Sequence, residues 1–354
     1  MNTIPLDAAT LAEAGRFNRK LAWAPRFRIR NRFMPMLGQA LLRVSQVGAD
    51  ARLERGGIRV EQRIAEADGL RVPVRILRPA PSRASAPKAL VIDIHGGGWV
   101  IGNARMDDRF NAARVQALDA VVVSVDYRLA TRTPLREIMD DCLAAARWVL
   151  RDGLPEYRAL PVFVVGESAG GHLAAGVLQR LQAGPGLMRR IAGTVLFYGV
   201  YDLAGSPSVQ AAGPDTLVLD GPGMAAALRL LTPSMSDAER RRAPLSPLYG
   251  DLAGMPPAWM AVGDIDPLRD DTLELAQRWR EVADVELNLL PDAPHGFIHF
   301  PTKMAELTLA RSHAWMREQL ARHTKVKAEV EAEEKSETAS LALDGISPAP
   351  GPAR

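Results

Sequence analysis

The stretch 162–174 constrains the fold of this chain more than any other part of the sequence. It opens with an unbroken β-branched and aromatic run, 162–165, which is typical of a strand buried on both faces of a parallel sheet. Residues rich in Ala and Leu follow Gly171 and predict a helix. The pattern Gly-x-Ser-x-Gly lies between them at 166–170, and glycines allow a turn this tight. We therefore interpret Ser168 as a nucleophile presented at the carboxyl edge of a parallel sheet, rather than as a serine in a chance loop.

Composition excludes several classes of protein. An apolar content of 47% in 354 residues is enough to bury a large core. The 44 basic residues against 41 acidic ones leave a net charge of +3, which is too balanced to predict a nucleic-acid partner. Cys142 is the single cysteine, so the chain forms no internal disulfide or thiolate metal cluster. No apolar run reaches the roughly 20 residues of a membrane span, and we expect a cytoplasmic protein without an integral membrane segment.

Strand and helix patterns alternate along most of the chain, which predicts an α/β fold with an eight-stranded, mostly parallel sheet and helices on both faces. The first two strands read as a hairpin turning at Asp68-Gly69. The eighth strand, 285–290, would form an exposed edge, and such an edge offers a surface for a possible homodimer. The expected strands are 57–67, 70–77, 89–94, 120–125, 162–165, 191–198, 257–263 and 285–290, and the main helices are 106–118, 134–150 and 268–282.

Two segments interrupt this alternation and predict a small helical cap. Residues 1–58 are rich in arginine interleaved with apolar residues, which predicts amphipathic cap helices; a plain solvated basic face and a peripheral membrane contact are the alternatives. Residues 199–254 form a proline-rich insertion after the sixth strand, with a helical stretch at 223–231. The catalytic domain would then span 59–323. The tail 324–354 has no apolar periodicity and predicts disorder.

A second motif, His95-Gly96-Gly97-Gly98-Trp99, follows the strand at 89–94. Three consecutive glycines let backbone N–H groups point at one oxygen without obstruction from side chains, as a tetrahedral oxyanion requires. The spacing does not fit the dinucleotide fingerprint Gly-x-Gly-x-x-Gly. A flexible loop is the alternative interpretation. His95 is expected to be structural or to line a pocket.

The remaining catalytic candidates follow the last two strands. Asp266 comes after the strand at 257–263, and His295 comes after the strand at 285–290. This order of Ser, Asp and His is the one used by one class of serine hydrolases. Asp266 could equally cap the next helix, because Pro267 suits a first helical position. Asp264 is the rival acid and His299 the rival base.

Five motifs in order resemble the hormone-sensitive-lipase-like family of α/β hydrolases: 95–99, 126–130, 166–171, 266–270 and 295–297. The resemblance implies an α/β-hydrolase fold and a serine carboxylester hydrolase acting on small-molecule acyl esters of short to medium chain length, without a metal or an organic cofactor. It implies that Ser168 is the nucleophile, His295 the base and Asp266 the acid. The implied oxyanion hole is Gly97, Gly98 and Ala169, supported by His95, Gly96, Trp99, Gly166, Glu167 and Gly170.

The chain departs from the family pattern at two places. Thr131-Arg132 stands where the family usually has Pro-Glu, and Glu167 stands where Asp or Thr is usual. The first departure concerns the packing of the cap, and the second the hydrogen bonding of the turn that carries Ser168. An amide hydrolase resembling the arylformamidases is an alternative function. A catalytically inactive binding module on the same fold is another.

Overall fold

A computed structural model of the chain describes residues 4–29, 34–81, 86–151 and 153–344. One eight-stranded sheet organises it, in the order β1-β2-β4-β3-β5-β6-β7-β8. β1 pairs with β2 and β2 with β4 in antiparallel fashion, and all other neighbouring strands pair in parallel. This pairing confirms the predicted sheet and the hairpin at Asp68-Gly69. The strands are β1 (Ile58–Ala67), β2 (Leu70–Pro79), β3 (Ala89–Ile94), β4 (Ala120–Val125), β5 (Val162–Glu167), β6 (Ile191–Phe197), β7 (Ala258–Gly263) and β8 (Val285–Leu290).

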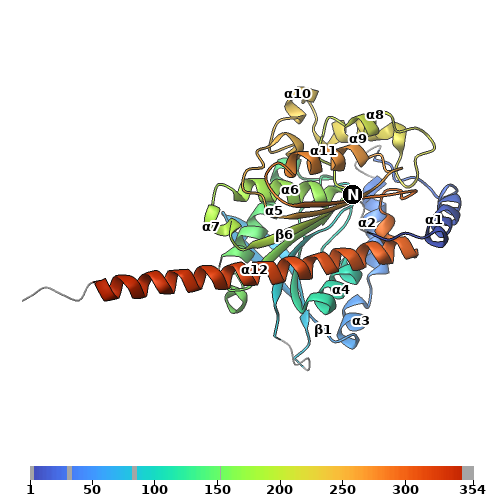
Figure 1. The fold of residues 1–354 in the computed structure, drawn as a ribbon. Helices are drawn as coiled ribbons and strands as arrows, with labels where there is room; N and C mark the ends of the chain where they lie inside the picture. The colour runs from blue at the N-terminus through green and yellow to red at the C-terminus, as the bar shows by residue number, and fades with distance from the viewer. Residues whose placement is uncertain (1–3, 30–33, 82–85, 152, 345–354) are drawn as a thin grey trace, which may run out of the picture.

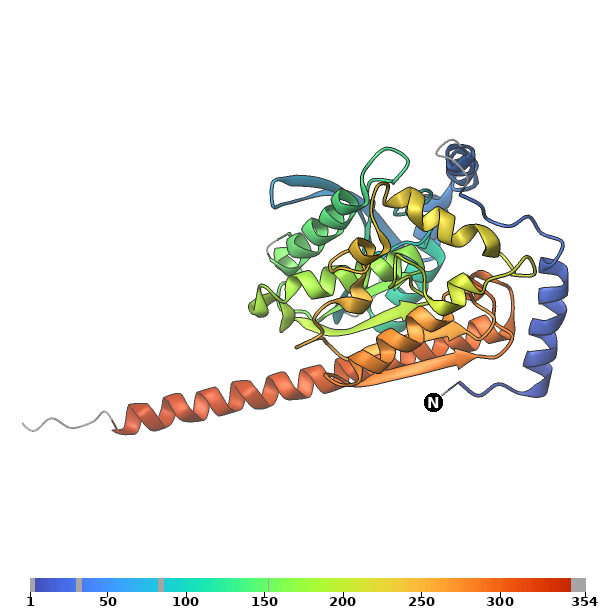
Figure 2. The ribbon, with the colours of Figure 1, turned by 90° about the horizontal axis from the view of Figure 1, so that it is seen from above.

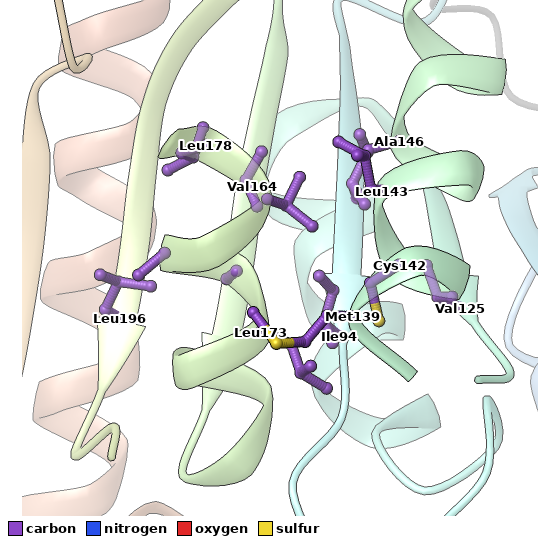
Figure 3. Packing of buried hydrophobic residues seen from close by; sticks show 14 of the residues in the cluster. Ile94, Val125, Met139, Cys142, Leu143, Ala146, Val164, Leu173, Leu178 and Leu196 are labelled. Carbon is purple, nitrogen blue, oxygen red and sulfur yellow. The ribbon is translucent and has the colours of Figure 1, made fainter. Parts of the chain in front are cut away.

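Helices cover both faces of the sheet (Figure 1). One face packs against α5, α6 and α11, and the other against α4 and α12. Side chains of α5 and α6 meet the strands in the larger apolar core, where Cys142 is buried as a packing residue (Figure 3). These helices are α4 (Asp108–Leu118), α5 (Leu135–Leu150), α6 (Ala169–Leu181), α11 (Arg269–Trp279) and α12 (Lys303–Asp344), and the short α7 (Pro185–Met188) follows α6.

The two segments predicted to form a cap are joined by backbone hydrogen bonds. The N–H of Phe27 donates to the carbonyl of Val218 at 2.6 Å, and the N–H of Asp220 donates back to the carbonyl of Phe27 at 3.1 Å. The N-terminal segment therefore crosses to the insertion that follows β6, as Figure 2 shows from above. The N-terminal helices are α1 (Ala8–Leu21), α2 (Met34–Ser45) and α3 (Ala49–Arg55), and the insertion carries α8 (Pro207–Gln210), α9 (Met224–Leu231) and α10 (Asp237–Arg240). Residues 1–3 and 30–33 of the predicted cap lie outside the described residues.

The C-terminal segment differs from its prediction. Disorder was expected from residue 324 onward, whereas α12 continues as one helix to Asp344 and projects past the sheet (Figures 1 and 2). The segment is rich in Ala, Glu and Lys, which are strong helix formers, so a helix needs no apolar periodicity there. Residues 345–354 of the predicted tail lie outside the described part of the chain. Within the described residues, none of the helices combines the length and the apolar character that a bilayer crossing requires.

Candidate active site

Ser168 occupies a strained turn between β5 and α6. Its φ of +52° lies in the left-handed region, which non-glycine residues rarely adopt. The turn is held by the Ser168 N–H, which donates to the carbonyl of Phe197 at 2.9 Å. A Cβ atom at Gly170 would overlap the carbonyl oxygen of Ile94, so only glycine fits this close approach of helix and strand. The geometry therefore places the Ser168 side chain at the N-terminus of α6, as the Gly-x-Ser-x-Gly pattern predicts.

Three side chains from separate loops meet at this turn. His295 Nε2 lies 2.9 Å from Ser168 Oγ, and His295 Nδ1 lies 2.9 Å from Asp266 Oδ2. Asp266 and His295 are both buried. Asp266 Oδ1 also accepts the N–H of Leu268 at 2.8 Å, within the turn before α11. The alternative prediction, that Asp266 caps the helix with Pro267 at its first position, is wrong, because α11 begins at Arg269 and its N-cap residue is Leu268.

The two rival residues are engaged elsewhere. Asp264 accepts the N–H of Asp292 at 2.8 Å. His299 Nε2 lies 2.7 Å from Glu167 Oε2. The structure brings neither rival into the hydrogen-bonded chain that joins Ser168, His295 and Asp266.

The glycine motif forms a loop beside Ser168. Gly97 and Gly98 have φ of +101° and +59°, and Trp99 follows at +61°. A Cβ atom at Gly97 would overlap the carbonyl of Ile101, which explains the need for glycine at this position. The loop is tied to the 126–130 motif, since the N–H of Ala130 donates to the Trp99 carbonyl at 2.7 Å.

His95 and His172 are both fully buried and contact neighbouring segments. The His95 ring stacks on Tyr127 with centroids 4.1 Å apart, and the Tyr127 hydroxyl donates to the His95 carbonyl at 2.7 Å. His172 bridges two segments: its Nδ1 accepts from Trp99 Nε1 at 3.3 Å, and its Nε2 contacts the carbonyl of Leu245 at 2.7 Å. Burial lowers the pKa of His172 to about 4, so the ring is neutral and suits both contacts.

Glu167 anchors a group of residues that the sequence did not reveal. Its Oε2 accepts the Tyr198 hydroxyl at 2.8 Å and contacts His299 Nε2 at 2.7 Å. The Tyr198 ring packs edge-on against His295, with centroids 4.8 Å apart. Burial alone would raise the pKa of Glu167, but His299 and the Tyr198 hydroxyl outweigh it and lower that pKa to about 2. The unusual Glu at 167 was the only signal, because a sequence does not tell which distant Tyr and His meet it.

Asp107 lies close to Glu167 and His299, and these three residues together are a candidate cation site among the described residues. Carboxylate oxygens of Asp107 and Glu167 and a ring nitrogen of His299 lie within 4.8 Å of one another. Glu167 and His299 are already paired, however, and burial raises the pKa of Asp107 well above its ordinary value. The burial that raises this pKa disfavours a charged carboxylate at Asp107. We therefore describe Glu167, Tyr198 and His299 as a hydrogen-bonded cluster, with Asp107 as a buried acid beside it.

A pocket of about 740 Å³ opens over Ser168. The catalytic side of the pocket contains Gly98, Ser168 and His295. The cap side is apolar and comes from both halves of the cap: Phe27, Ile29, Val218, Leu219, Met224, Leu228 and Leu231. The pocket is thus a mostly hydrophobic chamber with a few polar side chains, among them Ser168 and His295, an arrangement typical of small-molecule sites.

Comparison with known proteins places the chain in a family. A family model described as the alpha/beta hydrolase fold matches residues 91–299. The chain is 34% identical to the carboxylesterase NlhH of Mycobacterium tuberculosis over 257 residues, covering 69% of this chain and 76% of that protein. It is 30% identical to the ethyl acetate hydrolase of Pseudomonas putida, covering 68% and 75% of the two chains.

Solved structures agree with this result. The esterase LipW of Mycobacterium marinum matches with a TM-score of 0.72 at 26% identity, covering 91% of this chain and 98% of that one. An esterase from the bacterial hormone-sensitive lipase family matches with a TM-score of 0.68 at 26% identity, covering 89% and 100%. The family match extends over more than half of the chain, and these relatives cover more than two thirds of it. The chain therefore belongs to the hormone-sensitive-lipase-like esterases of the α/β-hydrolase family.

Proposed function

We propose that the protein is a serine carboxylester hydrolase with Ser168 as nucleophile, His295 as general base and Asp266 as the orienting acid. One observation carries this proposal: Ser168 Oγ, the His295 imidazole and the Asp266 carboxylate form a continuous hydrogen-bonded chain, with 2.9 Å at each link. Nucleophile, base and orienting carboxylate in this geometry are what acyl transfer requires. The esterase names of the relatives support the same assignment.

The proposed reaction has two halves. Ser168 Oγ attacks the ester carbonyl carbon while His295 Nε2 takes the hydroxyl proton, and Asp266 stabilises the resulting imidazolium. The carbonyl oxygen becomes an oxyanion that accepts the N–H groups of Gly97, Gly98 and Ala169. The ester C–O bond then breaks, and the alcohol leaves with the proton from His295. A water molecule, deprotonated by His295, next attacks the acyl-enzyme and releases the carboxylic acid and free Ser168.

The pocket suits acyl esters of short to medium chain length. Its volume of about 740 Å³ is enclosed by apolar side chains of both cap segments, which offer contact area to a hydrocarbon chain. The ester carbonyl would lie at the Ser168 end. We keep amide hydrolysis of the arylformamidase kind as the second candidate, since the same serine and glycine loop serve both reactions.

A series of p-nitrophenyl esters from acetate to palmitate tests the proposal. We expect turnover that is highest for the shorter esters and is lost in Ser168→Ala. A rate on N-formylkynurenine above that on aryl esters would favour the amide hydrolase. Folded protein with no serine-dependent turnover of either substrate would support the inactive binding module and overturn the proposal.

Two further predictions concern the setting of the enzyme. We propose a cytoplasmic location, which the single cysteine supports. We also propose a homodimer through β8, which is an edge strand of the sheet. Light scattering of the purified protein and of Leu289→Lys, a change on that strand, tests the dimer. A monomeric wild-type protein would contradict it.

A further inference from the structure

Helix α2 carries an apolar stripe on its outer side. Leu37, Leu41 and Val44 follow the spacing that brings helical residues onto one face, and they are 69%, 64% and 70% exposed. Val47, just beyond the helix, is 75% exposed. Single exposed apolar residues are ordinary, but three in one row form a surface that water solvates poorly. The exposed stripe therefore indicates a surface that binds a partner.

The side of α2 that faces the protein is firmly attached. Gln39 exchanges two hydrogen bonds with the backbone of Gly102, at 2.9 and 2.8 Å. Gln46 exchanges two with the side chain of Asn103, at 3.0 and 2.8 Å. Four hydrogen bonds thus fix how α2 is rotated about its axis, and the exposed stripe is a consequence of that rotation. Gly102 and Asn103 continue the loop that contains Gly97 and Gly98.

A cleft of about 650 Å³ lies next to the stripe, and arginines line it. Met36, Ala40 and Arg43 of α2 form one wall, so the helix contributes to the stripe and to the cleft at once. The segment 126–133 forms another wall. The arginines that line the cleft are Arg43, Arg63, Arg75, Arg105, Arg128 and Arg132.

Four of these arginines are paired with carboxylates. Arg63 pairs with Glu61, Arg128 with Asp141 and Glu137, and Arg75 and Arg105 share Asp50, while Arg75 also binds Asp108. Among the described residues, Arg43 and Arg132 have no carboxylate partner. The acid that lines the cleft, Asp126, accepts the N–H of Ala104 at 3.1 Å. The cleft therefore holds two exposed guanidinium groups that remain available for an anion.

The unpaired charge lies in the segment 126–133, at one of the two departures from the motif pattern described from the sequence. Arg132 at this departure lines the cleft. The arginine-rich N-terminus supplies Arg43, which lines the same cleft. Two features that the ester-hydrolase mechanism leaves unused thus meet in one place, beside an exposed apolar stripe.

We propose that α2 and this cleft dock the protein on an anionic membrane surface. Leu37, Leu41 and Val44 would enter the interface, and Arg43 and Arg132 would bind lipid phosphate groups. A helix with apolar residues on one side and arginines beside them binds a membrane surface through burial of the apolar residues and through attraction to anionic lipids. Each of these two contributions is weak alone. A purely soluble anion would satisfy the arginines but would leave the stripe exposed. The proposal does not depend on the proposed ester hydrolysis, because binding to vesicles needs no turnover.

Vesicle flotation of the whole protein tests this docking. We expect the protein to float with vesicles of phosphatidylcholine and phosphatidylglycerol, and to stay behind with phosphatidylcholine alone. Changing Leu37→Ser and Leu41→Ser together should abolish flotation. Arg132→Glu, which reverses this charge, should weaken binding at least about fivefold, as expected for one basic residue near a charged surface. Raising the salt concentration should weaken binding of the wild-type protein as well.

Matched variants outside the surface serve as controls. Val282→Ser removes another exposed apolar residue, 44% exposed, and Arg158→Glu reverses another exposed arginine; neither should change flotation. Three results would overturn the proposal. The first is equal binding to neutral and anionic vesicles. The second is no vesicle binding, with a dimer that Leu37→Ser dissociates, since a second copy would then cover the stripe. The third is stabilisation by inorganic phosphate without vesicle binding, which would make the cleft a site for soluble anions.

Discussion

The imidazole of His299 lies 2.7 Å from the carboxylate of Glu167, the residue that immediately precedes Ser168. Burial and the nearby Arg109 lower the pKa of His299, whereas Glu167 raises it, and the net direction is upward. An ion pair between a buried Glu167 and a partly exposed His299 thus adjoins the nucleophile. The pair restrains Tyr198 as well, because the same carboxylate oxygen accepts the Tyr198 hydroxyl.

Removing the charge of Glu167 should lower the pKa of His299. In Glu167→Gln, burial and Arg109 would act on the imidazole without the opposing carboxylate. An NMR titration of the His299 ring protons in the wild-type protein and in Glu167→Gln measures the change. His313, which is not in contact with Glu167, is the internal control. An unchanged His299 pKa would show that the ion pair does not form in solution.

The same pair should make stability depend on pH in a defined window. The pKa of Glu167 is lowered to about 2, so its stabilisation is present above the unfolded value and is lost as the pH falls. The pKa of His299 is raised, so its stabilisation is complete below its unfolded value of about 6.5 and is lost as the pH rises through the folded value. Urea unfolding should therefore show the largest difference between the wild-type protein and Glu167→Gln near about pH 5.5, and a smaller difference in alkali. A difference that is constant across this range would contradict the pairing.

Gly97→Ala should inactivate the enzyme with little effect on the rest of the fold. Its φ of +101° is open to glycine, and a Cβ atom there would overlap the carbonyl of Ile101. Misplacing an oxyanion donor costs about 10²–10³ in kcat, which ester kinetics would detect. Gly213→Ala is the matched control, because a Cβ atom there meets nothing within 4 Å. Equal activity of the two variants would exclude Gly97 from the oxyanion hole.

Arg114→Met should strongly destabilise the protein. The Arg114 guanidinium donates to Asp93 at 2.9 Å, and both side chains are buried. Its loss leaves Asp93 with hydrogen bonds from Asn111 and Ser124 but without a counter-charge, at a cost of about 3–5 kcal/mol. The control is Arg71→Met at an exposed ion pair with Glu66, which should cost below about 1 kcal/mol. Equal midpoints in urea unfolding for the two variants would contradict the account.

Local sequence rules predicted the sheet and the three side chains of the hydrogen-bonded chain. Most of the buried strands appear as apolar runs, and Ser168, Asp266 and His295 each lie in the segment that follows a predicted strand. Because parallel strands end at one edge of a sheet, their following loops meet there. The choice between Asp266 and Asp264 could not be made from spacing, since it depends on which carboxylate the turn before α11 aims at His295.

Other features depend on contacts between distant segments, and the sequence does not specify them. The meeting of Tyr198 and His299 on Glu167 requires the ends of β5 and β6 and the loop after β8 to be in place. The stripe on α2 depends on how Gln39 and Gln46 fix the rotation of the helix. The prediction missed the helix to Asp344 for another reason. It relied on apolar periodicity, which indicates packing against a core, whereas this helix follows from the intrinsic helix propensity of its residues.

Covalent labelling of Ser168 tests the central claim most directly. A fluorophosphonate probe reacts with a serine hydroxyl only where a base activates it and an oxyanion site accepts the phosphoryl oxygen. Peptide mass spectrometry should find one adduct, on Ser168, in the wild-type protein, no adduct in Ser168→Ala, and labelling slowed by at least about 10²-fold in His295→Asn. Folded wild-type protein that stays unlabelled, or Ser168→Ala that labels at the wild-type rate, would contradict the account.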